Sequence, residues 1–282
     1  MPVPETPVPA IPGPLVTVDW LGGNLSRVVV FDASVGARRG GGTRIPGARP
    51  FDLDGGLSDH CAPVPHTMPT AAAFEEAVRG LGVDDTDGVV VYDAAGIYSS
   101  ARAWWMFRAM GFDRVAVLDG GLPAWRAAGL PVEAAAAAYE GPRGSFTARP
   151  RPGLLVDADT VAAALGDPAA AVLDARTRER FAGTAPEPRP GLRGGHMPGA
   201  LNLPFGELQG PDGRMRPAGE LREAFEALAG RRERFYFSCG SGVTACVLAL
   251  GATLAGYGES AVYDGSWSEW GMPSDRPVAT GG

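Results

Sequence analysis

The stretch Ala116-Val-Leu-Asp-Gly120 returns in the second half of the chain as Ala261-Val-Tyr-Asp-Gly265, 145 residues later. A tryptophan follows each copy at the same distance, and Val89-Val-Val-Tyr-Asp93 keeps the same offset to Arg234-Phe-Tyr-Phe-Ser238. The turn sequence Ile45-Pro-Gly-Ala48 also has a counterpart, Met197-Pro-Gly-Ala200, in the same order. Ordered matches of this kind indicate that the chain is a duplicated domain.

Each half alternates short apolar runs with segments of helical periodicity. In the first half we expect strands at 28–31, 89–92 and 115–118 and helices at 71–80 and 100–110. In the second half we expect strands at 171–173, 235–237 and 261–263 and helices at 159–165, 218–229 and 244–255. Continuous Val-rich runs are typical of parallel strands buried on both faces. The pattern therefore predicts an α/β fold of two tandem domains, each a mostly parallel sheet flanked by helices. We place the domains at 15–135 and 154–278, joined by an Ala-, Pro- and Gly-rich linker at 136–153.

The 282 residues carry 32 acidic and 25 basic side chains, for a net charge of −7, and 45% of them are hydrophobic. Such a chain can bury a large core, but it lacks the basic surface of a general nucleic-acid-binding protein. We find no apolar run long enough for a membrane and no signal-peptide pattern, so we expect a cytoplasmic protein. With three cysteines, three histidines and no Cys-x-x-Cys spacing, we expect no disulfide framework, metal site or cofactor.

The segment Phe235-Tyr-Phe-Ser-Cys-Gly-Ser-Gly-Val-Thr-Ala-Cys246 places Cys239 between a buried strand and a helix. Functional groups of open α/β sheets collect at the carboxyl ends of strands. Because glycines permit unusual backbone conformations, several N–H groups after the cysteine should face one concavity, where the helix dipole adds positive potential. These N–H groups belong to Gly240, Gly242, Val243 and Thr244. Such a cradle favours a thiolate on Cys239 and the binding of an anion beside it. Cys246, two turns into the helix, is expected in the core.

The first copy lacks this cysteine, because Ala94 takes the position of Cys239 under the repeat alignment. The first domain is therefore expected to be inactive and to form one wall of the active-site cleft.

These motifs resemble those of the tandem-domain rhodaneses, sulfurtransferases with an inactive first domain and an active second one. Over about residues 15–278, the resemblance rests on the cysteine loop, on Tyr263-Asp-Gly-Ser-Trp-Ser-Glu-Trp270 and on Arg102-Ala-Trp-Trp-Met-Phe. The cysteine loop is similar to that of the 3-mercaptopyruvate sulfurtransferases. The resemblance implies that Cys239 takes a sulfur atom from 3-mercaptopyruvate as a persulfide, releasing pyruvate. The acceptor would be a thioredoxin, a low-molecular-weight thiol or cyanide.

The resemblance also implies two sets of site residues. Arg180 and Arg189 match the arginines that hold the carboxylate and the carbonyl group of mercaptopyruvate, and guanidinium forks suit a planar carboxylate. Asp54, His66 and Ser241 match a relay that would move a proton as the enolate leaves and becomes a ketone.

Three alternatives stay open. Thiosulfate could be the donor, but the family members that prefer it carry Arg and Lys directly after the cysteine, where this chain has Gly240 and Ser241. A Cys-dependent phosphatase would need an arginine at position 245, which is Ala here. A non-enzymatic sulfur carrier or redox sensor would use Cys239 without repeated turnover.

Overall fold

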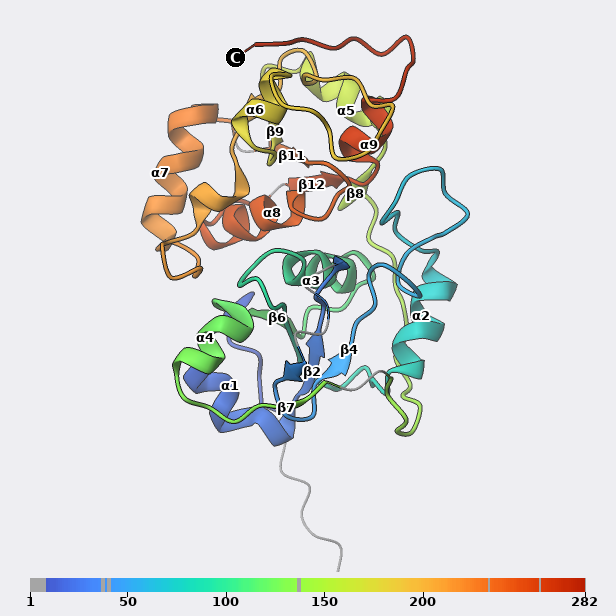
Figure 1. Cartoon of the computed structure of the whole chain (residues 1–282), viewed down its shortest axis with the longest axis vertical. Coiled ribbons are helices and arrows are strands. Elements are labelled where there is room, and N and C mark those ends of the chain that lie inside the picture. The colour runs from blue at the N-terminus through green and yellow to red at the C-terminus, as the bar shows by residue number, and fades with distance from the viewer. Residues whose placement is uncertain are drawn as a thin grey trace, which may run out of the picture.

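The computed structural model describes residues 9–36, 39, 42–135, 138–232, 234–258 and 260–281. They form two halves stacked along the long axis of the molecule, with the C-terminal half at the top of Figure 1. Each half is built on a five-stranded sheet in which every pair of neighbouring strands is parallel. The predicted duplication of an α/β unit is confirmed by this topology.

In the first half the strand order is β1-β6-β5-β2-β4. The strands are β1 (Leu15–Val16), β2 (Val29–Asp32), β4 (Arg49–Pro50), β5 (Val89–Tyr92) and β6 (Val115–Leu118). The helices are α1 (Val18–Asn24), α2 (Ala71–Gly80), α3 (Ser100–Ala109) and α4 (Gly121–Ala127), with a short 3-10 helix η1 (Leu25–Arg27). An antiparallel ribbon pairs β3 (Thr43–Arg44) with β7 (Glu133–Ala134).

In the second half the order β8-β12-β11-β9-β10 repeats the first, strand for strand. The strands are β8 (Leu155–Val156), β9 (Ala170–Asp174), β10 (Leu201–Asn202), β11 (Arg234–Ser238) and β12 (Ser260–Tyr263). The helices are α5 (Ala158–Leu165), α6 (Arg178–Ala182), α7 (Ala218–Ala229), α8 (Ala245–Leu254) and α9 (Ser266–Trp270), with the 3-10 helix η3 (Phe205–Leu208). No helix in the described ranges is both long enough and apolar enough to cross a membrane.

The predicted elements agree closely with these bounds. Strands 89–92 and 115–118 and helices 71–80 and 218–229 match residue for residue, and the others differ by one residue at one end or at both. The two-residue edge strands were not predicted, because so short a pairing leaves no periodic pattern in the sequence. Their role is to complete sheets whose central strands, β5 and β6, are buried along their whole length.

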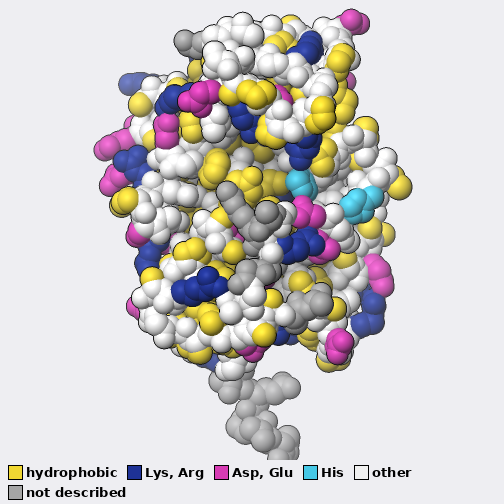
Figure 2. All heavy atoms as spheres, in the orientation of Figure 1, with side chains coloured by type: hydrophobic (Ala, Val, Ile, Leu, Met, Phe, Trp, Pro, Cys, Tyr) yellow, Lys and Arg dark blue, Asp and Glu magenta, His cyan; other side chains and the backbone are white. Residues whose placement is uncertain are grey.

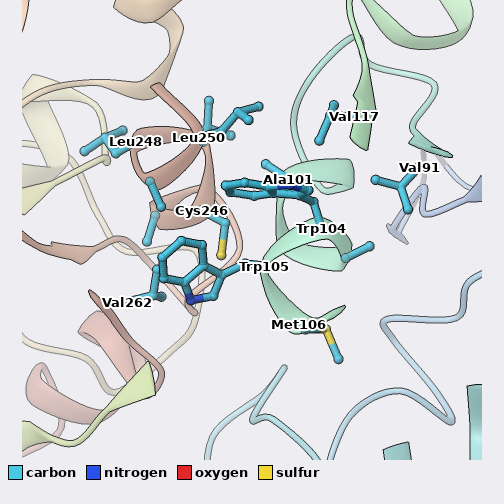
Figure 3. Close-up of a cluster of buried hydrophobic side chains, with 14 of the residues drawn as sticks. Val91, Ala101, Trp104, Trp105, Met106, Val117, Cys246, Leu248, Leu250 and Val262 are labelled. Carbon is cyan, nitrogen blue, oxygen red and sulfur yellow. The ribbon is translucent and has the colours of Figure 1, made fainter. Parts of the chain in front are cut away.

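The two halves share one apolar core, because α3 of the first half packs against α8 of the second. Figure 3 shows Trp105 of α3 lying beside Cys246 and Val262 of the second half. The indole Nε1 of Trp105 also donates to the carbonyl oxygen of Leu154 at 3.0 Å. The packing of α3 against α8 therefore holds the second half, with the loop of Cys239 at the start of α8, against the first half.

The segment that follows the first half packs onto it along much of its length. Phe146 is completely buried, and its N–H donates to the carbonyl oxygen of Val83 at 3.0 Å. Farther on, the N–H groups of Arg149 and Arg151 donate to the carbonyl oxygens of Met110 and Ala109, at the end of α3. The expected linker at 136–153 is therefore anchored to the first half wherever the structure describes these residues.

Candidate active site

Cys239 lies directly after β11, is buried, and begins a loop held in place by the segment 266–268. The hydroxyl oxygen of Ser266 accepts hydrogen bonds from the N–H groups of Cys239 and Gly242, both at 3.1 Å. In return, the carbonyl oxygens of Cys239 and Gly240 accept from the N–H groups of Trp267 and Ser268. Hydrogen bonds to residues 266–268 thus fix one side of the loop, and the other side, which we call the inner side, is not used by them.

The inner side of the loop carries N–H groups that have no hydrogen-bond acceptor among the described residues. They belong to Gly240, Ser241, Val243, Thr244 and Ala245. These groups lie at the N-terminal end of α8, where the helix dipole favours negative charge. The expected N–H of Gly242 is not among them, because it donates to Ser266. The loop can bind an anion next to Cys239 through the remaining groups.

The two glycines of the loop are required for different reasons. Gly242 has φ +74°, a left-handed conformation, and a Cβ there would lie 2.8 Å from the carbonyl oxygen of Asp264. Gly240 does not have a positive φ, so the expectation of an unusual backbone there was wrong. A Cβ on Gly240 would instead lie 3.2 Å from Nη2 of Arg180. Gly240 therefore makes room for an arginine side chain.

Asp54, His66 and Ser241 come together across the boundary between the two halves. Nδ1 of His66 lies 2.9 Å from Oγ of Ser241, and Nε2 lies 3.0 Å from Oδ1 of Asp54. Because a carboxylate only accepts, Nε2 carries the hydrogen of the neutral ring, and Nδ1 accepts from the Ser241 hydroxyl. Asp54 is itself held by the N–H of Gly36 at 2.7 Å and by Arg39 at 3.1 Å. The three side chains form a continuous hydrogen-bonded chain that ends in the cysteine loop.

The surroundings of Asp54 and His66 determine the protonation states of these two side chains. Burial lowers the pKa of His66 below its ordinary value, and Arg189 and Arg102 lower it further, while Asp54 partly opposes the shift. Burial acts to raise the pKa of Asp54, but hydrogen bonds from Gly36 and His66 and the charge of Arg39 outweigh it, so the net shift is downward. At neutral pH the relay therefore has an ionised Asp54 and a neutral His66, which is free to accept a proton.

Arg180 reaches the cysteine loop from α6, but one edge of its guanidinium group is occupied. Its Nη2 and Nε donate to the carboxylate of Glu187 at 2.5 Å and 3.3 Å. The same carboxylate accepts from Nη1 of Arg176 at 2.9 Å, and the side chain of Glu187 is only 2% exposed. Nη1 of Arg180 has no acceptor among the described residues, so it is the part of the guanidinium group that is left for a ligand.

Arg189 approaches the loop from the other side. Its Nη1 donates to Oγ of Ser268 at 3.1 Å, and that hydroxyl donates to the carbonyl oxygen of Gly240 at 2.6 Å. Arg189, His66 and Asp54 line a cavity of about 420 Å³, whose remaining wall comes from residues between 53 and 65. Figure 2 shows histidine, basic and acidic side chains gathered where the two halves meet. The wall of the cavity thus carries His66 and Asp54 of the hydrogen-bonded chain that ends at Ser241 in the cysteine loop.

A larger cavity of about 820 Å³ lies at the opposite end of the second sheet. Its lining includes Arg222, Arg234 and Tyr257, near the amino ends of the strands, and no Cys, Ser or His among the described residues. Because functional groups of parallel sheets gather at the carboxyl ends, we assign the chemistry to the smaller cavity.

The other two cysteines have different environments. Cys246 is fully buried, its thiol donates to the carbonyl oxygen of Gly242 at 3.2 Å, and burial raises its pKa to about 12. It is therefore a core residue, as expected. Cys61 is exposed in the loop between Asp54 and His66.

The first half has the same loop, but an internal carboxylate fills it. Oδ2 of Asp93 accepts from the N–H groups of Tyr98, Ser99 and Ser100 at 2.8–3.0 Å, and from Oγ of Ser100 at 2.7 Å. Under the repeat offset these three N–H groups correspond to the open ones of residues 243–245. The counterpart of Asp93 is Ser238, whose buried hydroxyl has no partner among the described residues. The first half thus lacks both the thiol and an open cradle.

Comparison with known families gives the decisive observation. A family model described as the rhodanese-like domain matches residues 17–128 and, a second time, residues 157–272. The chain belongs to the rhodanese family. The two matches fall on the two halves of the structure, so each half is a rhodanese-like domain.

The chain is similar to proteins named as sulfurtransferases. The chain is 41% identical over 235 residues to the 3-mercaptopyruvate sulfurtransferase of Escherichia coli strain K12, with 83% of this chain and 82% of that protein covered. It is 40% identical to the thiosulfate/3-mercaptopyruvate sulfurtransferase 1 of Arabidopsis thaliana, with 94% and 78% covered. The crystal structure of SseA from Escherichia coli superposes with a TM-score of 0.78 at 35% identity, covering 91% of this chain and all of that one.

The sequence did not reveal the side chains that hold this rhodanese site in shape. Ser266 and Ser268 fasten the cysteine loop, and both lie within the C-terminal signature, which was the only signal for them. Glu187 orients Arg180 but stands between two prolines, in a segment without periodicity. Arg102, from the first domain's signature, reaches the site across the boundary between the halves.

Proposed function

We propose that this rhodanese is a sulfurtransferase that takes a sulfur atom from 3-mercaptopyruvate and passes it to a thiol or to cyanide. The observation that carries the proposal is the buried Cys239 in a loop of open N–H groups, with a serine–histidine–aspartate relay ending in the same loop. The relatives named above as 3-mercaptopyruvate sulfurtransferases support the choice of donor.

In the first step the Cys239 thiolate attacks the sulfur atom of the donor. The carbon–sulfur bond breaks, a persulfide forms on Cys239, and the electron pair leaves with the pyruvate enolate. Ser241 and the neutral His66 can take up the thiol proton of Cys239 before the attack, and His66 can return it to the enolate carbon to give pyruvate. The proton of the donor thiol leaves the new persulfide as the persulfide becomes an anion. Arg180 and Arg189 would hold the donor carboxylate, and the loop N–H groups would stabilise the persulfide anion. An acceptor thiolate or cyanide then removes the outer sulfur and restores Cys239.

The first domain supports this use of the loop. Its N–H groups of residues 98–100, the counterparts of residues 243–245, all donate to the Asp93 carboxylate, so the N-terminal end of the corresponding helix already binds an anion within this chain. In the second domain Ser238 leaves that position open, where a persulfide or the reacting sulfur of the donor can take it.

Mercaptopyruvate suits this loop better than thiosulfate does. Thiosulfate is a small dianion without a carboxylate, and Gly240 and Ser241 offer it no side-chain cation beside the sulfur. We therefore expect a higher kcat/KM for 3-mercaptopyruvate. The acceptor, expected to be a thioredoxin or a low-molecular-weight thiol, and the cytoplasmic location remain predictions from the sequence.

The test combines mass spectrometry with turnover. After incubation with 3-mercaptopyruvate, the wild-type chain should gain one sulfur atom on Cys239 and release pyruvate, and added cyanide should yield thiocyanate over many cycles. Cys239→Ser should lose both, whereas Cys61→Ser, at an exposed site, should keep them. Persulfide formation without repeated turnover would point to a sulfur carrier, and full activity in Cys239→Ser would refute the mechanism.

A further inference from the structure

Arg102 is a buried arginine of the first domain that acts at the boundary with the second. It is the third residue of α3 and is only 1% exposed. Its Nη2 donates to Oδ1 of Asp264 at 2.6 Å and to the carbonyl oxygen of His66 at 2.8 Å. The other carboxylate oxygen of Asp264 accepts from the N–H of Met68 at 2.8 Å. Arg102 and Asp264 together hold the backbone of residues 66–68 at both ends.

The backbone that they hold is strained. His66 has φ +61°, a left-handed conformation that a residue with a side chain rarely adopts. Such a conformation persists only where its surroundings over-determine it. Here the carbonyl oxygen of His66 is fixed by Arg102, while its ring is fixed between Ser241 and Asp54. The strain therefore lies at the residue whose ring position matters most for the relay.

The duplication supplies an internal comparison. In the first domain Asp119 corresponds to Asp264, and its Oδ1 accepts from the N–H of Met215 at 2.9 Å, as Asp264 accepts from Met68. The residue that corresponds to Arg102 in the second domain is Val247, which has no guanidinium group. Arg214 acts on Asp119 through its charge, but it is exposed, and no described arginine donates a hydrogen bond to Asp119. A buried arginine that donates to the aspartate is present only on the side that has the catalytic loop.

Arg102 is also costly to bury. Its Nε and Nη1 are buried and have no acceptor among the described residues. Buried polar groups without partners are unfavourable, and each one in a native structure needs an explanation. A Cβ on Gly242 would lie 3.2 Å from Nη1, so this end of the guanidinium faces the cysteine loop. A role in simply joining the two domains does not require that arrangement.

We propose that Arg102 is a positioning residue, which holds residues 66–68 so that the His66 ring stays between Ser241 and Asp54. This inference rests on the relay of the proposed function. Without Arg102, the strained backbone at His66 can relax and the ring can move away from Ser241. Because displacements of about 1 Å can cost 10²-fold in rate, we expect Arg102→Met to lower kcat about 100-fold. KM for 3-mercaptopyruvate should stay within about twofold, since Arg102 does not touch the cavity.

A double-mutant cycle with His66→Ala separates positioning from a general structural role. If Arg102 acts through His66, Arg102→Met should change kcat by less than about twofold in the His66→Ala background. Equal losses in both backgrounds would overturn the inference, as would wild-type activity in His66→Ala. Arg108→Met is the matched control: it lies on the same helix, its guanidinium covers Trp104, and it should behave as wild type in both backgrounds.

Two further measurements keep the test decisive. If circular dichroism shows that Arg102→Met does not fold, Asp264→Asn takes its place in the cycle. It weakens the same contacts to residues 66–68 without removing side-chain volume. Its loss of kcat should likewise disappear in the His66→Ala background, and a loss that persists there refutes the inference. A wild-type chain that releases no pyruvate from 3-mercaptopyruvate would contradict the proposed function itself, whereas an active wild type with additive losses contradicts only the role of Arg102.

Discussion

Glu187 offers the sharpest test of how the donor site is built. Its carboxylate is only 2% exposed and accepts from both Arg176 and Arg180. Arg176 has a second acidic partner in Asp174, whereas Glu187 is the only side-chain acceptor of Arg180 among the described residues. Glu187→Gln keeps the shape and one acceptor oxygen but removes the charge. The change leaves Arg176 with the carboxylate of Asp174, whereas Arg180 keeps no ionised partner among the described residues.

Two effects of different size are expected. Removing one partner of a buried ion pair costs about 3–5 kcal/mol in the free energy of unfolding, and the remaining amide oxygen places Glu187→Gln near the lower limit. Freeing Arg180 adds the cost of ordering its side chain when the donor binds, about 0.5–1.5 kcal/mol. That cost corresponds to a rise of about 2- to 10-fold in KM for 3-mercaptopyruvate. The value of kcat should change less, because Arg180 is not a member of the hydrogen-bonded chain that moves the proton.

Urea denaturation and pyruvate release measure the two effects separately. Glu226→Gln is the control, because Glu226 pairs with Arg222 on the exposed face of α7 and should cost less than about 1 kcal/mol. If Glu187→Gln unfolds at the same urea concentration as wild type and keeps its KM, the buried network does not orient the donor site. A lowered stability with an unchanged KM would separate the network from donor binding.

Two further predictions concern single carboxylates. Because burial holds the pKa of His66 below its ordinary 6.5, kcat/KM should fall with acid only below pH 6.5. Asp54 raises the pKa of His66, so Asp54→Asn should move this fall to still lower pH. A fall that moves to higher pH in the variant would refute the relay. Asp93→Asn should lower the free energy of unfolding by about 3–5 kcal/mol in urea, because several buried N–H groups lose a charged acceptor worth about 1–3 kcal/mol each. Asp113→Asn, at an exposed ion pair, should cost less than about 1 kcal/mol, and equal losses in the two variants would contradict the assignment of Asp93.

The fold was predictable because its signals are local and repeated. Strands such as Val89–Tyr92 are continuous apolar runs, and the second copy of each motif gives an independent check on the first. The edge strands were not predictable, because two residues that pair with a neighbour carry no pattern of their own. The packing of Phe146 was missed for a related reason. A single aromatic residue in an Ala- and Gly-rich segment gives no sign of the surface that it covers.

The site residues that belong to a sequence motif could be predicted, whereas those that reach the site only through the packing of the two domains could not. The sequence placed Cys239 at the end of a strand, and the resemblance added Asp54, His66 and Ser241, which the structure brings into contact. It gave no means of finding what holds them, since the contacts of Arg102 with His66 and Asp264 span 36 and 162 residues. Such contacts depend on how two domains pack, which no local pattern encodes.

The two domains differ at two neighbouring positions of the corresponding loops. In the first domain Asp93 and Ala94 follow β5, and the Asp93 carboxylate accepts hydrogen bonds from the N–H groups at the start of α3. In the second domain Ser238 and Cys239 stand at the same places, and the N-terminal end of α8 is left without an internal anion. The first domain therefore satisfies its loop from within, and its His66 and Arg102 contact Ser241 and Asp264 of the second domain. We expect the first domain to act as a scaffold and the open loop of the second to bind the sulfur that is transferred.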